Sequence, residues 1–145
     1  MGQLRRAAAG KNVRFILDAD DDELRRQYAG ANVVLQPSLP SENSTMDTSE
    51  LLGLVTLEAM ACGKPVIVTR AGSLPELIVD GETGHLVAPY DPVALRELTA
   101  RLVLNPNLSQ AMGAAARQHV EAHFTWEQAA RRGLGFYHTL AAPFG

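Results

Sequence analysis

This 145-residue chain has one cysteine, no long apolar run and no large excess of acidic over basic residues, which number 16 and 13. The single cysteine, Cys62, cannot form a disulfide within the chain, and this fits a reducing compartment. The apolar runs are far shorter than the roughly 20 residues of a membrane-spanning helix, and the start of the sequence lacks a signal-peptide pattern. We therefore expect a cytoplasmic protein without a transmembrane segment.

The charge balance excludes one large class of partners. The formal net charge is -3 and no run of lysine and arginine exceeds two residues, so the sequence gives no indication of a nucleic-acid-binding surface. A hydrophobic content of 46% and a charged content of 20% are ordinary for a globular protein. We expect a single domain over residues 1–145, because this length can bury a core of useful size.

Short apolar segments alternate with helical patterns in the first part of the chain, and this alternation predicts an α/β fold. Segments that are apolar throughout are typical of parallel strands covered on both faces. We therefore expect a partial Rossmann-like parallel sheet of about four strands, flanked by helices. Strands are expected at residues 13–17, 32–36, 64–69 and 85–88, and helices at residues 21–28, 53–62 and 73–79.

The remainder of the sequence is helical in pattern and predicts a helical C-terminal tail over residues 92–140. Asp91 followed by Pro92 is typical of a helix start, with an N-cap and then a proline at the first helical position. Helices are expected at residues 93–104, 108–123 and 126–140. Capping boxes are expected at two helix starts, formed by Ser73 with Glu76 and by Thr125 with Gln128.

Two glutamates separated by seven residues are the most informative feature of the sequence. Glu50 and Glu58 bracket an apolar run that contains Gly53, and a Gly-Lys-Pro break and a β-branched strand follow. An ionised carboxylate inside an apolar stripe needs hydrogen-bond donors, because burying it without partners costs several kcal/mol. The hydroxyl groups of a ligand are one source of such donors.

The order of the motifs resembles the C-terminal half of a retaining glycosyltransferase with the GT-B architecture, in the group 1 family (family 4 of the sequence-based classification). Glu50 and Glu58 resemble the family's pair of glutamates seven residues apart. The resemblance runs from about residue 13 to residue 140. Four further segments carry it: AGSLPELI at residues 71–78, DGETGHLV at residues 80–87, Asp91-Pro92, and Phe124-Thr125-Trp126.

The resemblance implies a donor site around the helix at residues 53–62. Glu58 would bind the ribose diol of a nucleotide-diphosphate sugar, because two carboxylate oxygens suit two adjacent hydroxyls. Glu50 would contact the transferred sugar and is the candidate catalytic residue. The helix N-terminus would face the diphosphate, and the base would lie near the end of the first strand. The donor-binding positions are then Leu17, Leu52, Gly53, Leu54, Val55 and Glu58.

The implied activity is the transfer of a sugar, with retention, to an acceptor hydroxyl. No metal or other cofactor is expected, because a helix dipole and basic side chains stabilise the leaving diphosphate. The family's N-terminal acceptor domain, and two strands whose loop supplies an Arg and a Lys to the diphosphate, have no counterpart here. We therefore expect a part of a longer protein, or a truncated relative of the family, that is inactive alone. The alternatives are a non-catalytic ligand-binding or interaction module of this fold, and a GT-B sugar epimerase fragment.

The lack of two family strands also affects the expected sheet. The strand at residues 13–17 would lose its neighbours, and the strand at residues 32–36 would have an unpaired edge. Exposed strand edges pair with other strands. We expect these two strands to pair directly through a right-handed crossover, and the chain to form a weak homodimer at high concentration.

Simpler interpretations of the candidate residues stand beside the functional ones. Glu58 can be an ordinary surface glutamate, and Glu50 can gain about 0.3–1 kcal/mol from the helix dipole alone. Cys62 is expected to pack rather than to act as a nucleophile. His119 and His123 have the i, i+4 spacing of a zinc pair, but no third ligand is evident, so a solvated helix face is expected.

Overall fold

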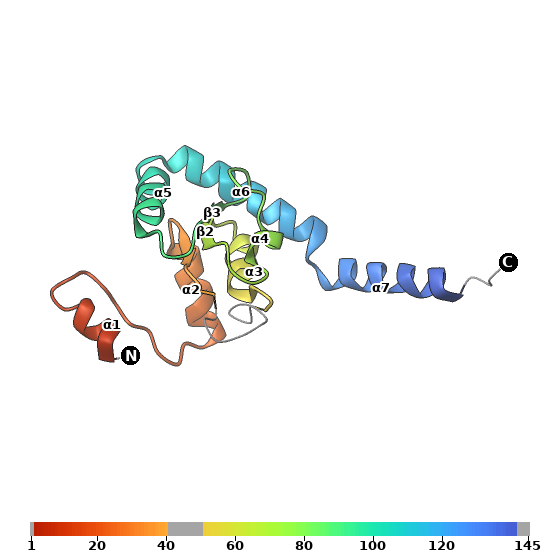
Figure 1. Cartoon of the computed structure of the whole chain (residues 1–145), viewed down its shortest axis with the longest axis horizontal. Helices are drawn as coiled ribbons and strands as arrows, with labels where there is room; N and C mark the ends of the chain where they lie inside the picture. Colours follow the sequence, from red (N-terminus) through yellow and green to blue (C-terminus); the bar gives the residue numbers. More distant parts are fainter. Residues whose placement is uncertain (1, 41–50, 142–145) are drawn as a thin grey trace.

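The computed structural model describes residues 2–40 and 51–141 as a three-stranded sheet with helices around it (Figure 1). Alternation of strands and helices confirms the predicted α/β class. The elements follow in the order α1 (Gly2–Ala7), α2 (Asp21–Gly30), β1 (Val34–Gln36), α3 (Leu54–Ala61), β2 (Val66–Thr69), α4 (Leu74–Leu77), β3 (His85–Val87), α5 (Pro92–Leu104), α6 (Pro106–His123) and α7 (Trp126–Ala141).

The sheet is parallel, with the strand order β1-β2-β3. All four residues of the central strand β2 are buried, as its apolar sequence predicts. Its side chains alternate between two packed layers. Val66 and Val68 lie in a cluster with Met60 of α3, whereas Ile67 packs with Leu102 of α5 on the other face. Helices therefore cover both faces of the sheet.

Residues 13–17 do not form the strand that their apolar sequence predicts, so the sheet has three strands rather than about four. The expected pairing of this segment with β1 is therefore wrong. A strand needs a neighbouring edge and a packed face, and this segment belongs to neither buried cluster. Val13 is 53% exposed and Leu17 is 50% exposed. Among the described residues, β1 pairs on one side, with β2.

Two of the three expected helix caps are present. The Asp91 side chain accepts a hydrogen bond from the Ala94 N–H at 2.9 Å, and Pro92 occupies the first turn of α5. The Thr125 hydroxyl accepts a hydrogen bond from the Gln128 N–H at 3.2 Å.

The capping box expected at Ser73 is not formed. Ser73 has helical backbone angles, φ -78° and ψ -10°, instead of the extended conformation that an N-cap residue needs. The Glu76 N–H bonds the Ser73 carbonyl rather than its side chain. Within the described part of the chain, the Ser73 hydroxyl is buried without a hydrogen-bond partner.

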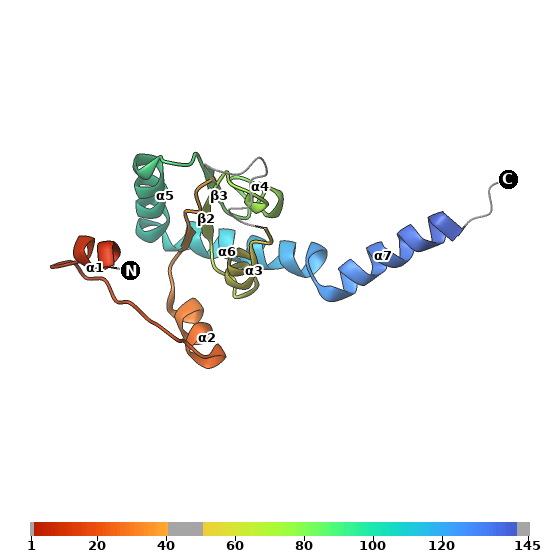
Figure 2. The ribbon, with the colours of Figure 1, turned by 60° about the horizontal axis from the view of Figure 1, so that its bottom comes forward.

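The last helix, α7, projects away from the rest of the molecule (Figures 1 and 2). The Arg132 guanidinium ties it to the end of α6 by donating to the His123 carbonyl at 2.9 Å. Trp126 at its start is 92% exposed, and Phe136 and Tyr137 are each 73% exposed. The predicted helical tail is confirmed as α5, α6 and α7. None of the helices in residues 2–40 and 51–141 is long and apolar enough to cross a membrane.

Candidate functional site

The start of α3 is shaped by Gly53, which has a left-handed backbone with φ +61°. A Cβ atom at this position would overlap the side chain of Leu77 in α4. Glycine is therefore required both by the backbone conformation and by the close packing of α4. Because glycine has no side chain, it cannot cap the first-turn N–H groups of α3 with a side-chain oxygen.

Glu58 lies one turn further along α3, at the surface. The expectation that this carboxylate is buried in an apolar stripe is wrong, because α3 is apolar on its solvent side as well. Leu54 is 57% exposed and Val55 is 47% exposed, whereas Ala59 and Met60 face the core. Glu58 therefore avoids the desolvation cost that its sequence context suggests.

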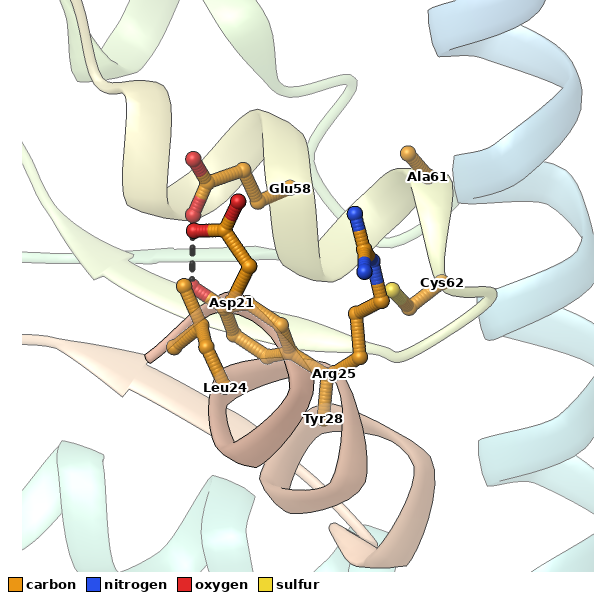
Figure 3. A pocket seen from close by; sticks show the side chains of 7 residues that line it. All are labelled: Asp21, Leu24, Arg25, Tyr28, Glu58, Ala61 and Cys62. Atoms are coloured by element: carbon orange, nitrogen blue, oxygen red, sulfur yellow. Dashed lines mark hydrogen bonds between the residues drawn. The ribbon is translucent and has the colours of Figure 1, made fainter. Parts of the chain in front are cut away.

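A tyrosine from α2 supplies the hydrogen-bond donor for Glu58. The hydroxyl group of Tyr28 lies 3.0 Å from Oε2 of Glu58 (Figure 3). It also lies 3.4 Å from the carbonyl oxygen of Val55. A phenol has one hydrogen to donate, and the shorter contact is the one to the carboxylate. Burial, and then the hydrogen bond to Glu58, raises the pKa of Tyr28 to about 12.

A pocket of about 320 Å³ opens between α2 and α3 beside this hydrogen bond. In Figure 3 the Glu58 carboxylate lies at one end and the Arg25 guanidinium extends toward Cys62 at the other. Cys62 is exposed, so its expected packing role is not observed. The pocket combines two carboxylates, those of Asp21 and Glu58, with a phenol, a guanidinium, a thiol and apolar walls. Its lining residues are Asp21, Leu24, Arg25, Tyr28, Glu58, Ala61 and Cys62.

A second, more apolar groove of about 450 Å³ runs between α3 and α7. Glu58 lines this groove as well, so its carboxylate lies where the two hollows meet. Leu52 and Leu54 contribute to the α3 side, and Trp126 contributes to the α7 side. A ligand along the exposed face of α3 would therefore contact both the helix start and Glu58.

Several predicted site residues lie together on α3, whereas one, Leu17, lies apart from them. Leu54, Val55 and Glu58 share the exposed side of α3, and Leu52 precedes the helix at 64% exposure. Leu17 lies before α2 and does not line the pocket at Glu58. Glu50, the candidate catalytic residue, lies outside the described residues.

Tyr28 is the site residue that sequence reasoning missed. It lies 30 positions before Glu58 and carries no motif of its own. The sequence pattern of α2 predicts a helix but does not indicate which helix it packs against. Only the fold places its hydroxyl at the carboxylate.

Arg70 and the two histidines of α6 each contact a nearby residue. Arg70, at the end of β2, forms an ion pair with Asp80 at 3.3 Å. The His119 and His123 rings lie 4.9 Å apart, and burial followed by the neighbouring His123 lowers the pKa of His119. Residues 2–40 and 51–141 contain no cluster of three or more metal-ligating side chains.

Comparison with known proteins identifies the family. Residues 3–119 match the family model described as glycosyl transferases group 1. A curated relative, the D-inositol 3-phosphate glycosyltransferase of Corynebacterium diphtheriae, is 40% identical over 120 residues, which are 83% of this chain and 26% of the relative. The chain thus spans about a quarter of the length of the first curated relatives that it matches.

Solved structures show the same architecture. Sucrose-phosphate synthase from Thermosynechococcus elongatus superimposes with a TM-score of 0.78 at 34% identity, over 98% of this chain and 34% of the synthase. The C-terminal domain of a group 1 glycosyl transferase from Francisella tularensis gives a TM-score of 0.63 at 26% identity, over 86% of this chain and 60% of that domain. Anabaena HepE in complex with UDP-glucose has the same fold, with a TM-score of 0.73 at 22% identity, over 98% of this chain and 35% of HepE.

Proposed function

Since this chain belongs to the group 1 glycosyl transferases, we propose that it forms the donor-binding part of a retaining glycosyltransferase. The donor is a nucleotide-diphosphate sugar and the acceptor is a hydroxyl group held by a further domain. The observation that carries this proposal is the arrangement on α3: an N-cap glycine, Gly53, which has no side chain of its own, followed one turn later by an exposed carboxylate held by Tyr28.

The arrangement suits the two polar ends of a nucleoside diphosphate. A helix N-terminus presents backbone N–H groups and a partial positive charge, which favour a diphosphate. Glu58 lies four residues after Leu54, about 6 Å along the helix axis, so one ligand can contact both. The Glu58 carboxylate suits the ribose diol, because ionised oxygens accept strong hydrogen bonds from adjacent hydroxyls.

The remaining roles follow from the family resemblance. Glu50 is assigned to the transferred sugar, and Leu52, Gly53, Leu54 and Val55 to the walls and backbone of the donor site. The leaving diphosphate is stabilised by the helix N-terminus without a bound metal ion. Reaction requires donor and acceptor to be held in near-attack geometry between two domains, so this chain alone is expected to bind donor without transferring sugar.

Isothermal titration with UDP, GDP, UDP-glucose and GDP-mannose tests the proposal. The unmodified chain is expected to bind at least one of these ligands weakly. Glu58→Ala is expected to weaken that binding at least about 10-fold, because it removes a charge-assisted contact. The control is Glu97→Ala on α5, which removes an exposed glutamate outside both hollows and should bind as the unmodified chain does.

Equal affinities for the Glu58→Ala and Glu97→Ala variants would remove Glu58 from the donor site. If none of the four ligands bound the unmodified chain, the chain would instead be a module without donor binding.

A further inference from the structure

The buried hydroxyl of Tyr28 links two parts of the candidate site. Its ring belongs to the core and is 7% exposed, so the hydroxyl has a fixed position. That hydroxyl lies between the first turn of α3, at the Val55 carbonyl, and the carboxylate of Glu58. The Tyr28 hydroxyl comes from α2 and the Glu58 carboxylate comes from α3, so their hydrogen bond depends on the packing of the two helices.

A glutamate held by a hydrogen bond has less conformational freedom than one without a partner. A surface glutamate samples many rotamers, and ordering it on binding costs conformational entropy. A hydrogen bond to Oε2 fixes the side chain before ligand arrives and uses one of about four lone-pair sites on the carboxylate. Within the described part of the chain Oε1 of Glu58 has no hydrogen bond, so it can accept hydrogen bonds from a ligand in the pocket beside it.

The hydrogen bond from Tyr28 to Glu58 requires the phenol to carry its proton. The phenol is neutral at physiological pH, as its pKa of about 12 and the ordinary value of 10.0 both require, so toward the carboxylate it can only donate. Arg25, the cation that lines the same pocket, forms an ion pair with Asp22 at 3.0 Å. Among residues 2–40 and 51–141, the side-chain hydrogen bond that orients Glu58 is therefore the one from Tyr28.

We propose that Tyr28 is a positioning residue that presents the Glu58 carboxylate to the 2′- and 3′-hydroxyls of the donor ribose. This inference rests on the proposed function and adds a second residue, from a different helix, to ribose recognition. It also predicts that the tyrosine affects selectivity for ribose, because Tyr28 acts on the ligand only through Glu58.

The experiment compares Tyr28→Phe with the unmodified chain in binding UDP, GDP and their 2′-deoxy counterparts. Tyr28→Phe removes one oxygen and keeps the buried ring. We expect about 5- to 20-fold weaker binding of the preferred ribonucleotide, and a clearly smaller loss for its 2′-deoxy form, which keeps only the 3′-hydroxyl of the pair. In the Glu58→Ala background, Tyr28→Phe should have no further effect. Tyr137→Phe, at an exposed position on α7, is the matched control and should change neither affinity.

A second variant keeps the test independent of any change in the core. Glu58→Asp retains the charge but shortens the side chain, which withdraws the carboxylate from the Tyr28 hydroxyl. It should lose preference for the ribonucleotide as Tyr28→Phe does.

Two results would overturn the inference while leaving the proposed function intact. One is unchanged ribonucleotide affinity in Tyr28→Phe alongside a loss in Glu58→Ala. The other is an equal loss of ribo- and 2′-deoxyribonucleotide affinity, which a merely structural role would produce. Absence of nucleotide binding by the unmodified chain would overturn both proposals.

Discussion

At the scale of single residues, Glu58 and Tyr28 show how a surface carboxylate acquires a defined position. Glu58 gains its hydrogen bond without being buried, because the donor rather than the acceptor is desolvated. The sequence identified the glutamate through its spacing from Glu50, which is a local pattern. Its partner belongs to another helix, and a contact between distant segments has no signature at either position.

Alkaline pH should reveal the coupling of Tyr28 to the fold. The folded-state pKa of about 12 is above the ordinary value of 10.0, so the neutral phenol is favoured by folding. Its contribution to stability is complete below pH 10 and is lost as the pH rises toward 12. Urea unfolding at pH 8 and pH 11.5 should show a loss in the unmodified chain that exceeds the loss in Tyr28→Phe by about 1–2 kcal/mol. Equal losses in the two proteins would contradict the assignment.

Gly53 should tolerate no side chain. Gly53→Ala combines a left-handed backbone with overlap at Leu77, and we expect a loss of about 2–4 kcal/mol in the free energy of unfolding. Gly81→Ala is the control, because Gly81 also has a positive φ, +83°, but open space at its Cβ position. It should lose about 1–2 kcal/mol, as backbone strain alone predicts. Urea unfolding that gave equal losses would show that packing against α4 is unimportant.

At the scale of elements, local signals predicted the packed strand and the long helices, but not features that depend on a neighbouring strand edge or on the backbone conformation. The buried strand β2 and the helices α5, α6 and α7 lie close to their predicted bounds. The segment at residues 13–17 has equally apolar residues, but strand formation requires a partner edge, which periodicity does not report. The Ser73 pattern matched a capping box in sequence, yet its backbone is already helical, so its side chain cannot cap.

The caps provide a matched test at this scale. Asp91→Ala should destabilise the protein by about 1 kcal/mol, because its side chain bonds the Ala94 N–H at the start of α5. Ser73→Ala should be neutral or slightly stabilising, because the buried hydroxyl has no hydrogen-bond partner among the described residues. Thermal unfolding of both variants measures the difference. A larger loss from Ser73→Ala than from Asp91→Ala would contradict this account of the two helix starts.

At the scale of the whole molecule, several apolar surfaces lack cover within the described part of the chain. Leu35 in β1 is 40% exposed beside a strand edge that the sheet leaves open, and α7 projects with Trp126 at its base. Such surfaces pair with other chains. Light scattering should show a concentration-dependent weak homodimer. A monomer over the full concentration series would contradict this expectation.

The fold could be predicted further than the site. An ordered set of motifs along the chain is enough to indicate a family architecture, because strand order and crossover direction follow from few rules. The site depends on side chains that meet across helices, such as Tyr28 with Glu58, and on which side of α3 faces solvent. The apolar residues Leu54 and Val55 suggested that this side of α3 is buried, but both side chains are exposed.

Amide chemical-shift mapping during a titration with UDP-glucose or GDP-mannose tests most directly whether α3 forms the donor site. We predict saturable shifts at the N–H groups of Leu54, Val55 and Thr56 and around Glu58, with weaker shifts near Tyr28. The same titration of Glu58→Ala should give markedly smaller shifts at equal ligand concentration. Shifts confined to α5 and α6, or an unperturbed α3 with both ligands, would contradict the account.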